Sequence, residues 1–61
     1  MVTKCWIIEN SVASAEAVKL IEETFPCFTF FELLETGDVE FTISCRVEDA
    51  ATIQSIISPH V

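Results

Sequence analysis

Three cysteines and a single histidine are the residues of this chain that could carry metal or nucleophilic chemistry. They stand at Cys5, Cys27, Cys45 and His60, and each cysteine lies in a separate apolar segment. Three thiolates and an imidazole that met on one face of a sheet would form the tetrahedral ligand set that zinc prefers. The cysteines lack the tight-turn spacing of structural zinc sites, so we expect them to act as small buried hydrophobic side chains. The sequence thus predicts no metal, no cofactor and reduced thiols.

Groups that could catalyse a reaction are also sparse. The histidine follows Pro59 near the end of the chain, where we expect a frayed tail residue. The carboxylate pairs Glu22–Glu23 and Glu48–Asp49 are adjacent in sequence. Such pairs are typical of a solvated helix face and of a helix start rather than of an acid–base dyad. No serine or cysteine stands in a recognisable nucleophile setting. We therefore expect that the protein is not an enzyme.

The charge of the chain is strongly negative. Ten acidic residues against three basic ones give a formal net charge of −7, and Lys4, Lys19 and Arg46 are scattered. Binding to nucleic acid requires clustered Lys and Arg that neutralise phosphates, so we expect no direct binding to nucleic acid. The acidity has two interpretations. It keeps a small protein dispersed in solution, or it complements the charge of a basic protein partner.

Length and hydropathy set further limits. The 61 residues, 51% of them hydrophobic, form at most one domain, residues 1–61. A chain of this size buries only about 60% of its unfolded surface, so its stability margin is thin and a partner subunit commonly adds to it. The odd number of cysteines, the lack of a signal-like start and the lack of a long apolar run predict a soluble cytoplasmic protein without membrane contact.

Hydrophobic periodicity predicts five elements. Residues Val39–Val47 alternate strictly between apolar and polar side chains, which indicates a β-strand with one buried face. Apolar residues at three- and four-residue spacings predict a helix over Val12–Thr24, closed by Pro26. The other predicted elements are strands at Val2–Glu9 and Cys27–Glu35 and a short second helix that starts with the acceptors Glu48 and Asp49 and stops at Ser58 and Pro59.

The element order β-α-β-β-α resembles the ferredoxin-like and ACT-like α+β sandwich without its last strand. The resemblance is one of topology and spans nearly the whole chain. It implies two layers, with a three-stranded sheet of order 1-3-2 and both helices on one sheet face. With a right-handed crossover we expect the first strand to run parallel to the third and to leave its outer edge without a partner. An ACT-like chain would in addition bind an amino acid or a similar effector.

The turn around Gly37 decides which side chains of the predicted hairpin face the helices. If Gly37 takes the left-handed position of a three-residue turn, Phe31 lies opposite Phe41 on the covered face. A two-residue turn would reverse the second strand and bury Glu32 instead. We favour the three-residue turn because a buried carboxylate without a partner is costly.

In the favoured register, the uncovered face of the hairpin has an aromatic centre and a polar rim, which is the make-up of a protein interface. The orientation of the first strand is open, and Trp6 and Ile8 extend this face in one of its two orientations. Thr42 and Arg46 are expected at the rim. The predicted interface residues are Trp6, Phe28, Phe30, Glu32, Leu34 and Glu40.

Two functions from different classes fit these features. The first is a non-enzymatic interaction module, a small acidic homodimer or higher oligomer that binds or inhibits a larger basic protein such as a nuclease, a toxin or a nucleic-acid-binding protein. The second is an ACT-like regulatory module that senses an amino acid or similar small molecule. Stabilisation by a metabolite would favour the sensor, and a protein partner recovered with the chain would favour the interaction module.

Overall fold

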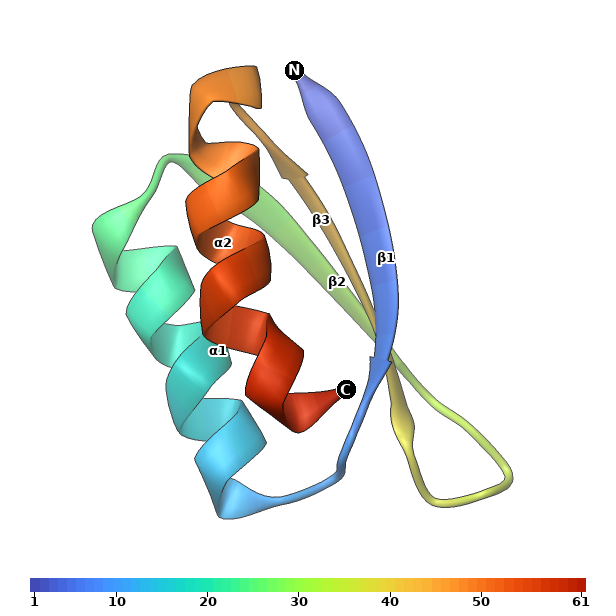
Figure 1. The fold of residues 1–61 in the computed structure, drawn as a ribbon. Helices are drawn as coiled ribbons and strands as arrows, with labels where there is room; N and C mark the ends of the chain where they lie inside the picture. The colour runs from blue at the N-terminus through green and yellow to red at the C-terminus, as the bar shows by residue number, and fades with distance from the viewer.

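The computed structural model covers all 61 residues, and its elements follow the predicted order (Figure 1). They are β1 (Val2–Ile8), α1 (Val12–Thr24), β2 (Cys27–Leu33), β3 (Val39–Cys45), the 3-10 turn η1 (Val47–Asp49), α2 (Ala50–Ile57) and the 3-10 turn η2 (Ser58–His60). The α+β class is confirmed, and each strand ends one or two residues earlier than predicted. Neither α-helix has the length and apolar composition that a membrane span requires.

The strands form one antiparallel sheet in the predicted order, β1-β3-β2. β1 runs antiparallel to β3, so the expectation of a parallel pair is wrong. The two strands that a β-α-β crossover joins run parallel to each other, and here these strands are β1 and β2. These two strands are parallel to each other because both are antiparallel to β3, which is inserted between them. This is the split arrangement of ferredoxin-like sheets.

The β2–β3 hairpin has the predicted three-residue turn. The N–H of Leu34 donates a hydrogen bond of 2.9 Å to the carbonyl of Asp38, and the N–H of Gly37 donates one of 3.0 Å to the carbonyl of Leu34. Gly37 has a φ of 92°, in the left-handed region that glycine tolerates best. β2 therefore pairs with β3 in the expected register, with Glu32 opposite Glu40.

One cluster of buried apolar side chains joins the sheet to the helices. In Figure 1 both helices lie in front of the sheet, and their buried residues meet β3 in this cluster. The alternation along β3 places Phe41, Ile43 and Cys45 there, all fully buried. We call their side of the sheet the core face and the other side the open face. The cluster contains Ile8, Ala17, Val18, Ile21, Phe41, Ile43, Cys45, Ile53 and Ile57.

Local hydrogen bonds define the limits of the helices. The Ser11 hydroxyl accepts a hydrogen bond of 3.2 Å from the N–H of Ser14 and so caps the first turn of α1. Phe25 is extended because a proline follows it, and α1 ends there. Asp49 precedes α2 but makes no side-chain capping bond, so its expected capping role is wrong. Its carboxylate instead accepts a hydrogen bond from Arg46.

The C-terminal segment is tied to the end of β1. The carbonyl oxygen of His60, in η2, accepts a hydrogen bond of 2.8 Å from the N–H of Glu9, the residue that follows β1. His60 is half-buried, so the expectation of a frayed tail residue is wrong. Figure 1 shows the C-terminus next to the lower part of β1. No backbone hydrogen bond joins the tail to β1 itself.

Candidate interaction surface

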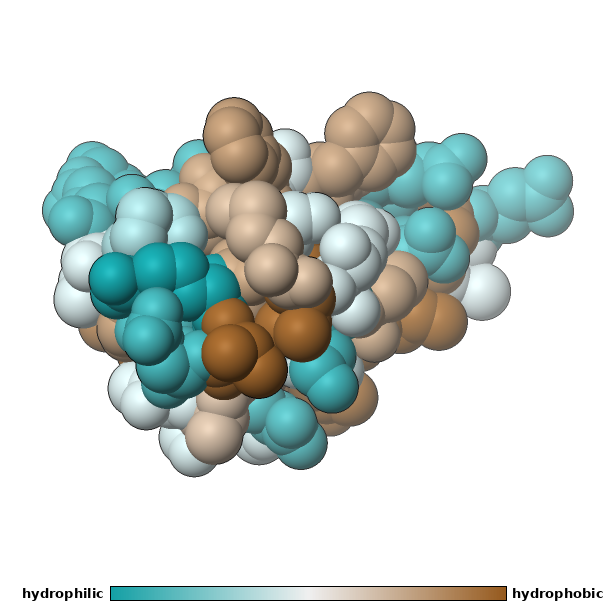
Figure 2. Space-filling model, turned by 90° about the horizontal axis from the view of Figure 1, so that it is seen from above, coloured by the Kyte–Doolittle hydropathy of each residue, from teal (hydrophilic) through white to brown (hydrophobic).

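The open face of the sheet exposes two phenylalanine rings. Phe28 and Phe30 on β2 are 72% and 68% exposed, whereas Phe41 in the core is fully buried. Their placement follows from the hairpin register, because residues of one parity share a face. Brown side chains project along the upper edge of Figure 2, the side that lies behind the sheet in Figure 1. Exposed aromatic surface of this kind marks a binding site more often than isolated apolar residues do.

Polar side chains of β3 lie next to these rings. Phe30 lies opposite Thr42, and the next pair on the same face, toward the turn, is Glu32 opposite Glu40. Both glutamates therefore have the predicted placement on the open face. Like charges that face each other across a strand pair are unfavourable. A cationic group bound between them would relieve that repulsion.

The orientation of β1 places Trp6 on the core face rather than on the open face. Trp6 lies opposite Phe41 on the core face, and the two rings stack with a centroid separation of 6.1 Å. Ile8 is buried in the core cluster. The expected placement of Trp6 on the open face is therefore wrong. β1 contributes Cys5 and Ile7 to the open face instead.

Ile7 also lies on the open face, although it is not among the predicted interface residues. It is 52% exposed and lies opposite Glu40, so it flanks the carboxylate pair on the side away from β2. Both parities of β1 are largely apolar, and alternation alone does not separate them. Thr3 and Glu9 share the parity of Ile7, but the charged Lys4 shares the parity of Trp6, so the polar residues do not separate the two sides either.

The hairpin end of the sheet is also exposed on the core face. Phe31 and Leu33 have the predicted core-face parity, yet they are 46% and 69% exposed. Figure 1 shows the reason, since the hairpin extends past the helices. Full helix coverage of Phe31 was therefore a wrong prediction, although its ring stacks on Phe41 at 5.2 Å. Leu34, a predicted interface residue, lies in the turn after β2 and is half-buried.

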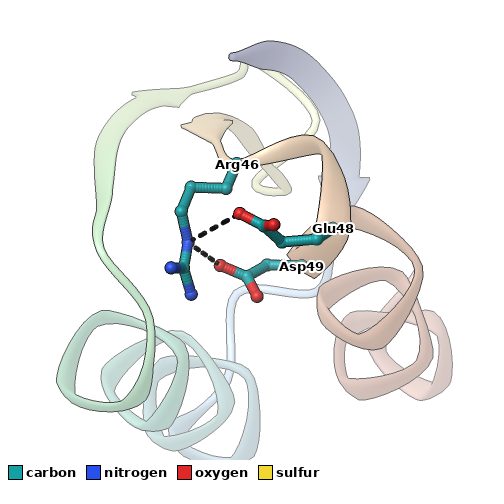
Figure 3. Close-up of polar contacts among 3 residues, drawn as sticks. All are labelled: Arg46, Glu48 and Asp49. Atoms are coloured by element: carbon teal, nitrogen blue, oxygen red, sulfur yellow. Dashed lines mark hydrogen bonds and ion pairs between the residues drawn. The ribbon is translucent and has the colours of Figure 1, made fainter.

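Arg46 does not border the open face as expected. Its Nε donates a hydrogen bond of 2.7 Å to Oδ2 of Asp49 and lies 3.4 Å from Oε1 of Glu48 (Figure 3). The hydrogen bond to the buried Asp49 carboxylate raises the pKa of Arg46. Figure 3 shows the guanidinium directed toward the helices. The only charged side chains that the paired strands place on the open face are therefore the carboxylates of Glu32 and Glu40.

The three cysteines do not come together as a zinc site. Cys27 and Cys45 lie opposite each other on the core face, whereas Cys5 lies on the open face. No three side chains of the metal-binding types lie close enough together to hold an ion. All three thiols are free. Burial, and after it the nearby Glu22 carboxylate, raises the pKa of Cys27.

A cleft at the start of α1 is a second feature with room for a ligand. Its volume is about 210 Å³. Its lining includes the apolar residues Ile8, Val18 and Phe31 and the acidic residues Glu9 and Glu22. Pockets for drug-sized ligands measure about 300–1,000 Å³, so this cleft suits only a smaller molecule.

Comparison with known proteins adds no family to this description. No protein-family model, curated protein sequence or solved structure matches the chain. The residues of the open face and of the cleft are therefore the features that bear on function.

Proposed function

We propose that this protein is a non-enzymatic interaction module that binds a larger, basic protein through the open face of its sheet. One observation carries the proposal: Phe28 and Phe30 are 72% and 68% exposed on a face whose charged strand residues are Glu32 and Glu40. Aromatic rings contribute strongly to binding when a partner covers them. The carboxylates beside them select the charge of that partner.

The charge of the open face favours a basic partner over a second copy of the chain. Glu32 and Glu40 already oppose each other, and the chain carries a net charge of −7. A second copy stacked on this face would bring two such pairs together, whereas Lys or Arg side chains of a basic protein would pair with them. A nuclease, a toxin or a nucleic-acid-binding protein offers such a surface. Covering that surface would inhibit it.

Affinity capture with matched variants tests this function. The immobilised chain is expected to retain a basic protein, and Phe30→Ala is expected to lose it because a ring that is 68% exposed contributes little to folding. Leu20→Ala removes another apolar side chain, 52% exposed on α1, and is expected to keep the partner. Equal capture by the wild type and by both variants would contradict binding through the open face.

The cleft at the start of α1 supports a second candidate function, the sensing of a small molecule. The carboxylates of Glu9 and Glu22 suit an ammonium group, and the apolar side chains of Val18 and Phe31 suit an aliphatic or aromatic body. An amino acid or a related amine of modest size combines the two. The ACT-like topology implies the same class of effector.

A thermal-shift measurement separates the two functions. An amino acid or amine that raises the melting temperature by several degrees would support the sensor, because a ligand that binds only the folded state stabilises it. Glu22→Gln is expected to reduce that rise, and Phe30→Ala is expected to leave it unchanged because Phe30 lies on the other face. Capture of a basic partner without any such rise would support the interaction module.

A further inference from the structure

We propose that the outer edge of β1 binds a second copy of this chain by antiparallel pairing of β1 with β1 of that copy. β1 is an edge strand because the sheet order is β1-β3-β2. The backbone N–H and C=O groups along such an edge are available to another strand. This surface is separate from the open face, and the proposal does not depend on the docking of a basic protein.

The outer edge of β1 carries few of the features that normally prevent strand addition. Val2–Ile8 contains no proline, and it pairs with β3 residue by residue without a bulge. The hydrogen bond between Glu9 and His60 lies one residue beyond the end of the strand. Short strands, bulges, prolines and several charges usually protect an edge, and Lys4 is the one charge that β1 offers.

The charge distribution singles out β1 as the edge for self-association. Two copies that each carry a net charge of −7 repel one another, so their interface has to avoid acidic surface. β1 contains Lys4 and no acidic residue, whereas the other edge strand, β2, contains Glu32. Lys4 is exposed and forms no ion pair within the chain. A like-charged copy therefore meets less repulsion at the β1 edge than at the β2 edge.

Symmetry restricts the register of this pairing. A two-fold axis perpendicular to the sheet keeps both core faces on one side and sets one residue of β1 opposite its own copy. Centring the pair on Cys5, the middle residue of Val2–Ile8, pairs all 7 residues of the strand. Lys4 then lies opposite Trp6 of the second copy, a pairing that allows a cation–π contact. Centring on Lys4 would instead oppose two ammonium groups.

Pairing at β1 leaves the aromatic rings of the open face accessible. Phe28 and Phe30 lie on β2, at the sheet edge farthest from β1. The dimer would have one continuous sheet with both open faces on the same side. It would thus present two separate sites to a basic partner, which raises the overall strength of binding to a multivalent or extended surface.

Crosslinking through Cys5 tests the register. Side chains opposite each other in an antiparallel pair have Cβ atoms about 4.5–5.5 Å apart, so the two Cys5 thiols would be close enough to join after a small adjustment. Oxidation by copper–phenanthroline, which takes two electrons and two protons from the thiol pair, is expected to give a covalent dimer on a non-reducing gel. Cys5→Ser is expected to abolish that dimer, and Cys27→Ser to retain it. A product that stays monomeric, or a dimer that survives Cys5→Ser, would overturn the proposed pairing.

A matched pair of charge reversals tests the edge by sedimentation equilibrium. Lys4→Glu puts a carboxylate into each paired strand and is expected to weaken the dimer by about tenfold or more. Lys19→Glu makes the same change of net charge on the exposed surface of α1 and is expected to keep the wild-type dimer. Circular dichroism checks that both variants fold. A wild-type chain that is monomeric at micromolar concentration, or equal weakening by both variants, would refute pairing at β1. Neither result changes the capture test with Phe30→Ala.

Discussion

Cys27 and Cys45 lie opposite each other on the core face, yet they differ in what surrounds them. Cys45 is fully buried among apolar side chains, whereas Cys27 is half-buried and has Glu22 nearby. Burial, followed by the Glu22 charge, raises the pKa of the Cys27 thiol above its ordinary value of 9.0. The folded chain therefore holds the Cys27 proton at a pH where the unfolded chain has lost it.

This difference predicts a pH dependence. The preference for the protonated thiol stabilises the folded chain below pH 9.0 and is lost as the pH rises through the raised pKa of Cys27. Alkylation of Cys27 by iodoacetamide, followed by peptide mass spectrometry, is expected to reach its half-maximal rate at a higher pH in native protein than in denatured protein. Glu22→Gln is expected to reduce this pH difference between native and denatured protein. Identical profiles in the native and denatured chains would show that the folded environment does not hold the proton.

The stability lost when a phenylalanine is replaced by alanine should increase with the burial of its ring. Phe41 is fully buried between the rings of Trp6 and Phe31, so Phe41→Ala is expected to cost about 3–5 kcal/mol and to unfold much of the chain. Phe30→Ala removes an exposed ring and is expected to change the free energy of unfolding by less than about 1 kcal/mol. Phe31→Ala should fall between them, because its ring is 46% exposed but stacks on Phe41. Urea denaturation measures all three, and a larger loss for Phe30→Ala than for Phe41→Ala would contradict the assigned faces.

The β2–β3 hairpin depends on one backbone conformation. Gly37 has a φ of 92°, and no atom beyond Gly37 and its two chain neighbours lies within 4 Å of the position that a Cβ would take. Gly37→Ala is therefore expected to destabilise the chain through backbone strain alone, by about 1–2 kcal/mol. Gly37→Asn is expected to cost less, because asparagine visits the left-handed region more readily. Thermal denaturation compares the two, and an alanine variant as stable as the wild type would argue against this turn.

The elements that follow from strong local signals are the ones that the sequence predicts well. Strict alternation identifies β3, the turn at Gly37 sets the hairpin register, and Pro26 marks the end of α1. Phe28 and Phe30 could be assigned to the open face because their placement depends only on that register. Local signals thus determine the half of the candidate surface that lies on β2 and β3.

The features that depend on packing between distant segments could not be read from the sequence. The direction of β1 depends on β3 being inserted between the strands that α1 connects. The orientation of Trp6 depends on which side of a largely apolar strand meets the helices. The exposure of Phe31 depends on how far the hairpin extends past the helices. Each of these is a property of the tertiary arrangement rather than of any one segment.

The two association surfaces that we propose, the β1 edge and the open face, differ in how charge acts on them. The β1 edge would join two copies that repel each other through their net charge of −7, whereas the open face would attract a basic protein. Salt screens both the repulsion between copies and the attraction of the partner, because the Debye length falls from about 10 Å at 0.1 M to about 3 Å at 1 M. Added sodium chloride is therefore expected to strengthen the dimer in sedimentation equilibrium and to weaken capture of the basic partner. A dimer that dissociates on addition of salt would contradict an interface chosen for low repulsion.

Binding of a basic protein through Phe28 and Phe30 is tested most directly by calorimetric titration of the captured partner into matched variants. Phe30→Ala is expected to bind at least about tenfold more weakly than the wild type, because a ring at the centre of an interface contributes much of its binding energy. Leu20→Ala, which removes an exposed side chain from α1, is expected to bind within about twofold of the wild type. Equal affinity of Phe30→Ala and the wild type, or a larger loss in Leu20→Ala, would contradict the assignment of the open face as the binding surface.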